Sequence, residues 1–365
     1  MIDWTKSMRQ TFEYYIVDPA TWANKDTVDF VTSSTVKRDL KSDTLGSAQI
    51  DCDQVLPECY IRIYLIAEQG LETHRECLGT WLCQTPGVSF DGRVSKASID
   101  AYTPLIELKE NPPPIGYFLA GGTNIVDMAY RITRENVRAP VVKSTGTVTL
   151  SDGFVSELSD TWFTFLTDLL AYGNYRYDLD ELSRIIFAPN QDLNSLQPRW
   201  TYDDGNSSIL FPDVDLDRDL YGIPNVLEVV FSMDHHVFYS RVVNDDPNSP
   251  ISTVQRGREV VSRITDPEII GAPEKSRHMS DGEIEAFQTV LDNYARQELR
   301  NMSSLEYTLT YSHGYNPVRP GDCVLFGYKR SGLEKVKAKV ISQSIKCQTG
   351  CVVEETAVYT ANLWG

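Results

Sequence analysis

The stretch Tyr60-Ile61-Arg62-Ile63-Tyr64-Leu65-Ile66 combines aromatic and β-branched residues with partial alternation of polar and apolar side chains, which is typical of a half-buried β-strand. Gln69-Gly70 follows as a turn, and Cys77-Leu78-Gly79-Thr80-Trp81-Leu82 supplies a second strand-like stretch. Other short strands of the same character surround this pair within the first hundred residues. Several strands at such spacing favour a small antiparallel barrel or sandwich.

The run Asn111-Pro112-Pro113-Pro114 interrupts this pattern, because three successive prolines continue neither a sheet nor a helix. We therefore expect an N-terminal β-barrel domain over residues 1–110. Beyond it, apolar residues at helical spacing predict three helices. One lies around residues 125–132, one runs from Ser159 or Asp160 to about Tyr172, and one begins near Ser280 and Glu283, which have the spacing of a capping box.

Strand character returns at about Ser304, where Tyr307-Thr308-Leu309-Thr310-Tyr311 alternates and Arg319-Pro320-Gly321-Asp322 forms a turn. The expected fold class is therefore α+β and mainly β, with two small antiparallel β-barrel domains flanking a central α/β region. The central region would span residues 111–302 and the C-terminal barrel residues 303–365. Either barrel can be discontinuous by borrowing strands from the central region.

The charge of the chain is unevenly distributed. Its 365 residues include 34 Lys and Arg against 51 Asp and Glu, a formal net charge of −17. Because affinity for a phosphate backbone comes largely from basic side chains, this balance argues against a general nucleic-acid binder. Residues 178–219 hold ten acids against three bases, whereas residues 319–346 hold seven Lys and Arg against two acids. The basic segment either meets an acidic neighbour or forms a solvated hairpin, and we slightly favour the hairpin.

Motifs for membrane, metal and catalytic chemistry are missing from the sequence. No window approaches the roughly 18 apolar residues of a membrane helix, so we expect no membrane insertion. Cys347-x3-Cys351 is one loose knuckle without the second that a zinc site needs. We predict no metal site, no cofactor and no catalytic residue, because the P-loop, HExxH and GxSxG motifs are also absent. The cysteines are expected to be reduced and mostly buried: Cys52, Cys59, Cys77, Cys83, Cys323, Cys347 and Cys351.

The run Asp213-Val214-Asp215-Leu216-Asp217-Arg218-Asp219 resembles the start of a calcium loop. It fails the EF-hand pattern, because Arg218 stands where glycine is needed and Pro224 where glutamate is needed. In an extended strand alternate residues share a face, so its carboxylates would repel one another unless they are solvated or bind a cation. We favour a solvated acidic edge. The candidate site residues, for an acidic lumen or a cation-contacting face, are Asp213, Asp215, Asp217 and Asp219.

Six further segments, read together, carry a likeness to a known family. They are Tyr14-Tyr15-Ile16-Val17-Asp18-Pro19 with Trp22, Asp43-Thr44-Leu45-Gly46-Ser47-Ala48, Tyr221-Gly222-Ile223-Pro224-Asn225-Val226-Leu227-Glu228-Val229, Asn244-Asp245-Asp246-Pro247-Asn248-Ser249-Pro250-Ile251-Ser252, Gly257-Arg258 and Arg319-Pro320-Gly321-Asp322. Their order resembles that of phage baseplate hub and tail-tip proteins. The resemblance covers most of the chain, but its motifs are structural turns and strands, so no catalytic residue is carried over.

The resemblance implies a structural virion protein of the tail tip or baseplate, made in the host cytoplasm, and not an enzyme. Three subunits with two similar barrels each would form a homotrimeric ring that joins the sixfold tail tube to a threefold spike or fibre. Its partners would be the distal tail or tube protein, the tape-measure protein and the central spike or fibre protein. Contact with passing DNA would be transient and not sequence-specific. The alternatives are a tail-associated cell-wall hydrolase and a host-glycan-binding β module.

Overall fold

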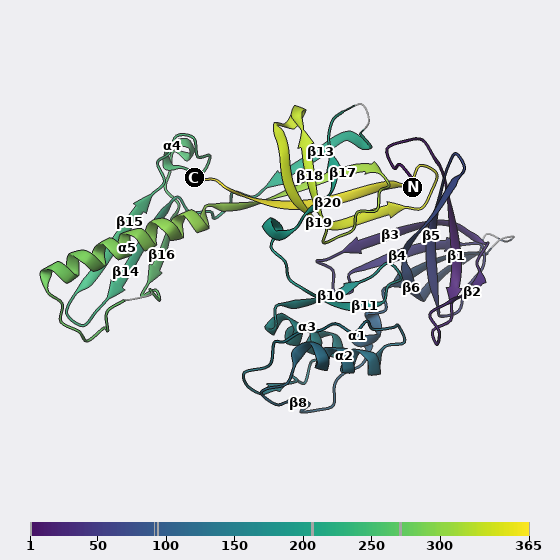
Figure 1. The fold of residues 1–365 in the computed structure, drawn as a ribbon, viewed down its shortest axis with the longest axis horizontal. Coiled ribbons are helices and arrows are strands. Elements are labelled where there is room, and N and C mark those ends of the chain that lie inside the picture. Colours follow the sequence, from purple (N-terminus) through teal and green to yellow (C-terminus); the bar gives the residue numbers. More distant parts are fainter. Residues whose placement is uncertain (1, 91, 93–94, 206–207, 270–271, 365) are drawn as a thin grey trace. The chain divides into compact units, whose positions relative to one another are not determined.

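The computed structural model of the protein describes residues 2–90, 92, 95–205, 208–269 and 272–364. Internal contacts group the chain into two compact units, each built from two stretches of sequence (Figure 1). The first unit comprises Met1–Asp215 and Thr310–Ala357, and the second comprises Leu216–Leu309 and Val358–Gly365. The division into domains at 1–110, 111–302 and 303–365 stays a prediction.

The N-terminal strands form an antiparallel sheet in the first unit, in the order β3-β4-β7-β6-β5-β1-β2. Their bounds are β1 (Arg9–Val17), β2 (Asn24–Thr27), β3 (Val31–Asp39), β4 (Gly46–Cys52), β5 (Cys59–Gln69), β6 (Glu72–Phe90) and β7 (Ser95–Tyr102). The hairpin expected from the sequence is confirmed as β5 and β6. Gly70 turns between them at a φ of 63°, which glycine adopts without steric cost.

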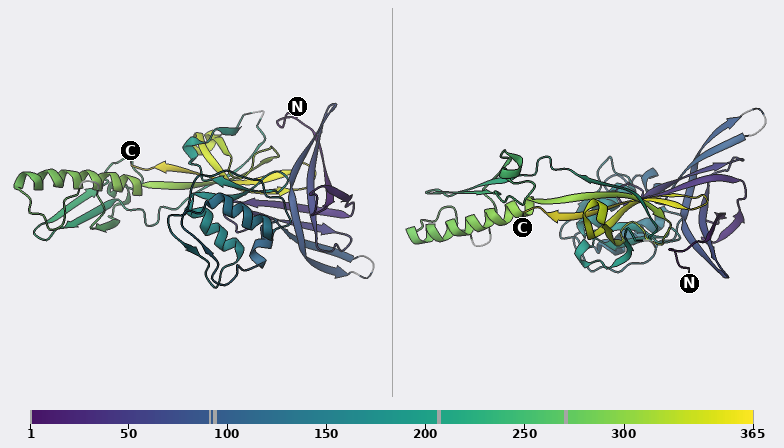
Figure 2. Two further views of the ribbon diagram at one scale, coloured as in Figure 1. Left: turned by 60° about the horizontal axis from the view of Figure 1, so that its bottom comes forward. Right: turned by 90° about the horizontal axis from the view of Figure 1, so that it is seen from above.

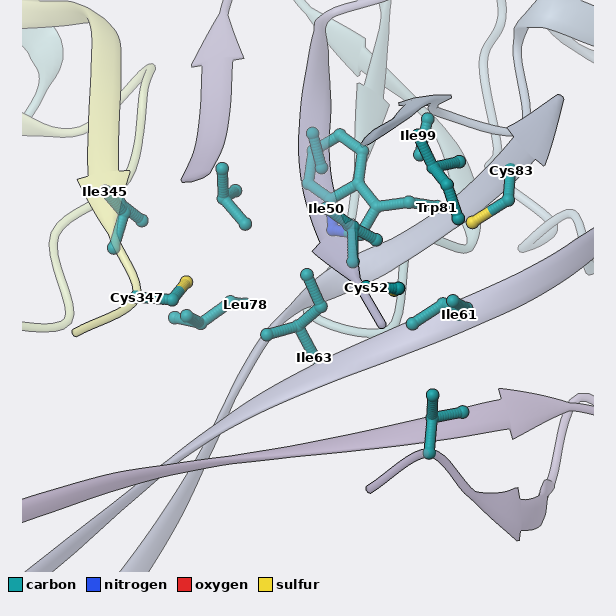
Figure 3. Packing of buried hydrophobic residues seen from close by; sticks show 14 of the residues in the cluster. Ile50, Cys52, Ile61, Ile63, Leu78, Trp81, Cys83, Ile99, Ile345 and Cys347 are labelled. Carbon is teal, nitrogen blue, oxygen red and sulfur yellow. The ribbon is translucent and has the colours of Figure 1, made fainter. Parts of the chain in front are cut away.

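The core of this sheet explains why the alternation in β5 was only partial. Ile61, Ile63 and Leu65 pack into a cluster with residues of β4, β6, β7 and the C-terminal strands (Figure 3). Tyr60 and Arg62, at the alternate positions of the strand, are also buried, because this part of the other face of the hairpin is covered as well. The Arg62 guanidinium donates there to Thr80, Asn24 and the Trp22 carbonyl at 2.8, 3.0 and 3.1 Å. A buried guanidinium is tolerated because its donors are satisfied.

The C-terminal strands continue the same sheet. They are β12 (Pro198–Tyr202), β13 (Leu210–Arg218), β17 (Ser304–Gly314), β18 (Cys323–Tyr328), β19 (Leu333–Lys346) and β20 (Val352–Asn362). The first part of β19 pairs with β18 and its last part pairs with β3, from Ser342 opposite Asp39 to Lys346 opposite Thr35. The mainly β fold is confirmed. Among the described strands, however, no ladder closes into a barrel, and β19 joins both β regions into one 13-stranded sheet.

A cluster of helices lies between the two sets of strands in the sequence of the first unit. Figure 2 shows these helices side by side. The elements are α1 (Ile106–Glu110), β8 (Phe118–Leu119), α2 (Ile125–Asn136), β9 (Phe154–Val155), α3 (Trp162–Tyr172), β10 (Tyr175–Leu179), β11 (Ile185–Pro189) and the short 3₁₀ turn η1 (Leu193–Ser195). Both helices expected here are confirmed. The cap of α3 is Thr161 rather than Ser159 or Asp160, because Thr161 and Thr164 bond reciprocally at 3.2 and 2.9 Å.

The second unit packs a long helix on a three-stranded sheet. Strand β14 (Val226–Ser232) pairs antiparallel with β15 (Val237–Val243) and parallel with β16 (Val261–Thr265). Helix α5 (Asp281–Met302) covers the sheet with Phe287, Leu291, Ala295 and Leu299, and Glu283 accepts from the Ser280 amide at 2.9 Å, as the capping box predicted. The second unit also contains the short helix α4 (Thr253–Arg256). In the first unit, the 3₁₀ turn η2 (Lys329–Ser331) lies between β18 and β19.

In the described part of the chain, no helix has the length and apolarity needed to cross a membrane.

Candidate functional site

The four candidate aspartates lie along β13 and just beyond its end. All four are exposed, whereas Leu210 and Val214 on the same strand are partly buried. Leu216 and Arg218, which lie between the aspartates, are exposed as well, so a shared face for the four carboxylates stays a prediction. Asp213 and Asp215 belong to the first unit, and Asp217 and Asp219 to the second. Their assignment to a lumen or a cation-contacting face stays a prediction.

The preference for a solvated acidic edge over a cation site stays a prediction. Asp219 accepts a hydrogen bond from the Tyr221 amide at 2.8 Å, which is a local turn contact. Within the described ranges, no three His, Cys, Asp or Glu side chains come together as metal ligands would. Like charges at alternate positions of one strand add up to a local negative potential, which repels polyanions within about a Debye length of 8 Å at physiological salt.

The upstream part of the acidic segment contacts the basic segment 319–346, which comprises the turn before β18 and the hairpin of β18 and β19. Strand β12 pairs in parallel with β18. The Lys337 ammonium donates to the Asn194 carbonyl at 3.0 Å, and the Arg319 guanidinium donates to the carbonyls of Leu179 and Asp180 at 3.3 and 3.1 Å. The basic segment is thus used inside the first unit, and its neighbour includes the chain's own acidic segment.

A buried polar network inside the first unit was not predicted from the sequence. Its members come from β3, β12, β17, β19, β20 and the segment after β17, and each is at most 7% exposed. They are Arg38, Tyr202, Tyr311, His313, Asn316, Gln343 and Glu355. Charged and polar groups at this depth are tolerated only when they are hydrogen-bonded to one another.

Glu355 is the centre of this network. One carboxylate oxygen accepts from the Tyr311 hydroxyl, and the other accepts from the Gln343 amide at 2.7 Å. Gln343 in turn donates to the Val318 carbonyl at 2.8 Å and accepts from the Arg38 guanidinium at 3.4 Å. Since Arg38 lies on β3 and Glu355 on β20, the network ties the N-terminal strands to the C-terminal strands.

His313 adds a second arm to the network. Its Nδ1 lies 2.7 Å from the Gly314 carbonyl, and because a carbonyl only accepts, Nδ1 carries a proton. Its Nε2 lies 3.4 Å from the Glu355 carboxylate and 3.1 Å from the Tyr202 hydroxyl. The Asn316 amide donates to that same hydroxyl at 2.8 Å. Every polar group of this arm therefore has a partner.

Burial governs the protonation of the two tyrosines in the network. Burial, followed by the charge of Glu355, raises the pKa of Tyr202 and of Tyr311 well above its usual value, so both hydroxyls remain donors. A Glu, a His and two Tyr resemble an acid–base set, but Glu355 and His313 are fully buried. A substrate could reach them only if the sheet opened. The signal in the sequence is the alternation Val353, Glu355, Ala357, which places a carboxylate at an inward position of β20.

Comparison with solved structures relates this fold to phage tail proteins. The tail protein from Neisseria meningitidis MC58 matches 97% of this chain and 98% of its own length, with a TM-score of 0.58 and 10% sequence identity. The 43 kDa tail protein of prophage MuSo2 from Shewanella oneidensis matches 95% of this chain and 98% of its own, with a TM-score of 0.57 and 11% identity.

A third match is to one chain of a two-protein complex. In the PdpA–VgrG complex of Francisella, one chain matches 96% of this protein but only 53% of its own length, with a TM-score of 0.54 and 8% identity. No protein-family model and no curated protein matches the sequence. Since nearly the whole chain aligns with both tail proteins, this protein has the fold of phage tail proteins, the fold that its sequence resemblance implied.

Proposed function

We propose that the protein is a structural component of the tail tip or baseplate of a tailed bacteriophage. Three copies form a hub ring that joins the sixfold tail tube to a threefold spike or fibre, and DNA passes through the ring during ejection. The neighbours of the ring are the distal tail or tube protein, the tape-measure protein and the central spike or fibre protein. The protein acts in the virion.

The observation that carries this proposal is the end-to-end match with two tail proteins. Each match covers at least 95% of this chain and 98% of the other, so the likeness extends to the second unit as well as the sheet. Each subunit has an N-terminal and a C-terminal β region within its one sheet, so a trimer would have six such regions. A sixfold partner can then meet equivalent surfaces on a threefold ring.

The oligomeric state tests the hub directly. We expect the purified full-length chain to have a mass of three times 41.2 kDa in light scattering coupled to size exclusion, and to be present in isolated tails. A monomer at every concentration tested, together with its absence from tails, would contradict the hub. Clearing of cell walls in a zymogram by such a monomer would favour the hydrolase instead. Binding to a glycan array would favour the carbohydrate-binding module.

We further propose that Asp213, Asp215, Asp217 and Asp219 face the lumen of the ring. A trimer would carry a formal charge of 3 × −17 = −51, and exposed carboxylates in the channel would keep DNA from adhering as it passes. The support is the exposure of all four side chains, three on β13 and Asp219 just beyond its end. This electrostatic effect weakens at high salt because counterions screen it.

Charge reversal tests the lumen assignment. We expect tails in which all four aspartates are replaced by lysine to release DNA more slowly at low salt, with recovery at high salt. Reversal of the exposed Asp26 and Asp29 is the control and should leave release unchanged. Equal slowing in both variants, or a tail structure with the four carboxylates on the outer rim, would rule the assignment out.

A further inference from the structure

Two cysteines face each other directly across the hairpin of the first sheet. Cys59 is the first residue of β5, and Cys83 on β6 is its register partner. Both side chains pack on the cluster that contains Ile61 and Trp81, so they lie on the same face of the hairpin. The two thiols are in hydrogen-bonding contact, although all seven cysteines of the chain are unbridged in the structure.

This placement suits a disulfide. Directly opposed residues of an antiparallel pair have Cα atoms about 4.5–5.5 Å apart, and disulfides span Cα separations of about 4.4–6.8 Å. The side chains of such a pair also point the same way. A bond between the two sulfurs therefore requires rotation of the thiols and no separation of the strands.

The two thiols differ in access and acidity. Cys59 is partly exposed, whereas Cys83 is only 3% exposed. The hydrogen bond from the Cys83 thiol lowers the pKa of Cys59, and the same contact keeps the proton on Cys83 and raises its pKa. Burial raises the pKa of Cys77 to about 11. Cys59 is thus the thiol that a reagent can reach, and Cys83 is placed to attack next.

We propose that Cys59 and Cys83 form a cross-strand disulfide when the protein meets a low-molecular-weight disulfide such as oxidised glutathione. The Cys59 thiolate attacks one sulfur of that reagent, forming a mixed disulfide and releasing one glutathione thiolate. Cys83 then loses its proton and attacks the Cys59 sulfur, which expels the second glutathione as thiolate. The two cysteines are oxidised together by two electrons, and one glutathione disulfide is reduced to two thiols.

The setting of this reaction follows from the proposed function, but its chemistry does not. A virion protein folds in a reducing cytosol and meets oxidising surroundings only after the host lyses. The bond would then close the loop from residue 59 to residue 83 and fasten β5 to β6. Because the test uses the purified chain, its failure would leave the tail-hub proposal unaffected.

Peptide mapping tests the bond. The folded full-length chain is incubated with oxidised glutathione, its remaining thiols are alkylated, and it is digested with trypsin without reduction. We expect peptide 42–62 to be linked to peptide 76–93, with the link lost on reduction. Since these peptides also carry Cys52 and Cys77, Cys52→Ser and Cys77→Ser are the matched controls and should retain the link. Cys59→Ser and Cys83→Ser should each abolish it.

Thermal unfolding supplies an independent readout. We expect oxidation to raise the midpoint of unfolding by about 5 °C, because closing a loop of this length restricts the unfolded chain. Reductant should reverse the shift, and the Cys83→Ser variant should not show it. The inference is overturned if the folded chain carries only a mixed glutathione adduct on Cys59. It is also overturned if, after incubation with oxidised glutathione, the Cys59 thiol is still free and is fully alkylated.

Discussion

Replacement of Glu355 by leucine should lower the free energy of unfolding by about 3–5 kcal/mol, because one partner of a buried charged network is removed while the others remain. The Tyr311 hydroxyl and the Gln343 amide would lose their common acceptor, and His313 would lose its carboxylate neighbour. Leucine has nearly the same volume, so the loss would come from unsatisfied polar groups and not from a cavity. Urea unfolding followed by circular dichroism measures it.

The adjacent Glu354 provides the control for this variant. It lies on the same strand but faces solvent, so Glu354→Leu should change the stability by no more than about 0.5 kcal/mol. Glu355→Gln should be intermediate, because the amide keeps one acceptor and adds a donor. If Glu355→Leu is as stable as the parent protein, the network does not hold the two β regions together, and its polar groups are satisfied in some other way.

A second large effect is expected at Gly46, the first residue of β4. Its φ is 141°, and a Cβ atom there would lie 2.2 Å from the Lys37 carbonyl oxygen and 3.1 Å from the Arg38 Cα. Both atoms belong to the backbone of β3 and cannot move without disturbing the β3–β4 ladder, in which Gly46 is the partner of Arg38. We expect Gly46→Ala to cost about 3 kcal/mol, from strain in φ and from overpacking.

Gly70 separates these two causes. Its φ is also positive, at 63°, but nothing lies within 4 Å of an added Cβ. Gly70→Ala should therefore cost only about 1 kcal/mol, the penalty for a left-handed conformation alone. Urea unfolding of both variants measures the difference. Equal losses at the two positions would mean that the β3–β4 strands relax around the new methyl group and that close approach at Gly46 is not what requires glycine.

Glu355→Leu and Gly46→Ala act on the same row of paired and hydrogen-bonded residues in the sheet. Gly46 pairs with Arg38, and Arg38 pairs on its other side with Gln343 of β19, which is bonded to Glu355. This row crosses from the N-terminal strands to the C-terminal strands. Loss of this row would therefore weaken the connection between the N-terminal and the C-terminal strands.

Local patterns in the sequence predicted local structure well. The aromatic and β-branched runs predicted β5 and β6, because side chains of these types favour an extended backbone within a short segment. The helix α5 and its capping box at Ser280 followed from spacing, since a helix and its cap are made within a few residues. The cap of α3 was misplaced by one or two residues because Ser159, Asp160 and Thr161 are all good caps, and only the backbone decides between them.

The acidic row shows how far such patterns extend. Alternation predicts that the four aspartates share a face. All four are exposed, but so are Leu216 and Arg218 between them, so the shared face stays a prediction. The hydrogen bonds that the Arg319 and Lys337 side chains donate were not predicted. Their acceptors are backbone carbonyls 139 to 143 residues away in the sequence. Any residue type presents a carbonyl, so such contacts have no signature in the sequence.

The sequence by itself determined the β5–β6 hairpin, helices α2, α3 and α5, and the uneven charge, because each depends on residue types within a short window. Only the tertiary structure decided that β19 pairs with β3 and that Arg38 meets Gln343 across 305 residues. It also decided which inward charges find partners and which two of seven cysteines face each other. Pairing between distant strands depends on the combined burial and hydrogen bonding of the whole sheet, and no single segment of the chain specifies that combination.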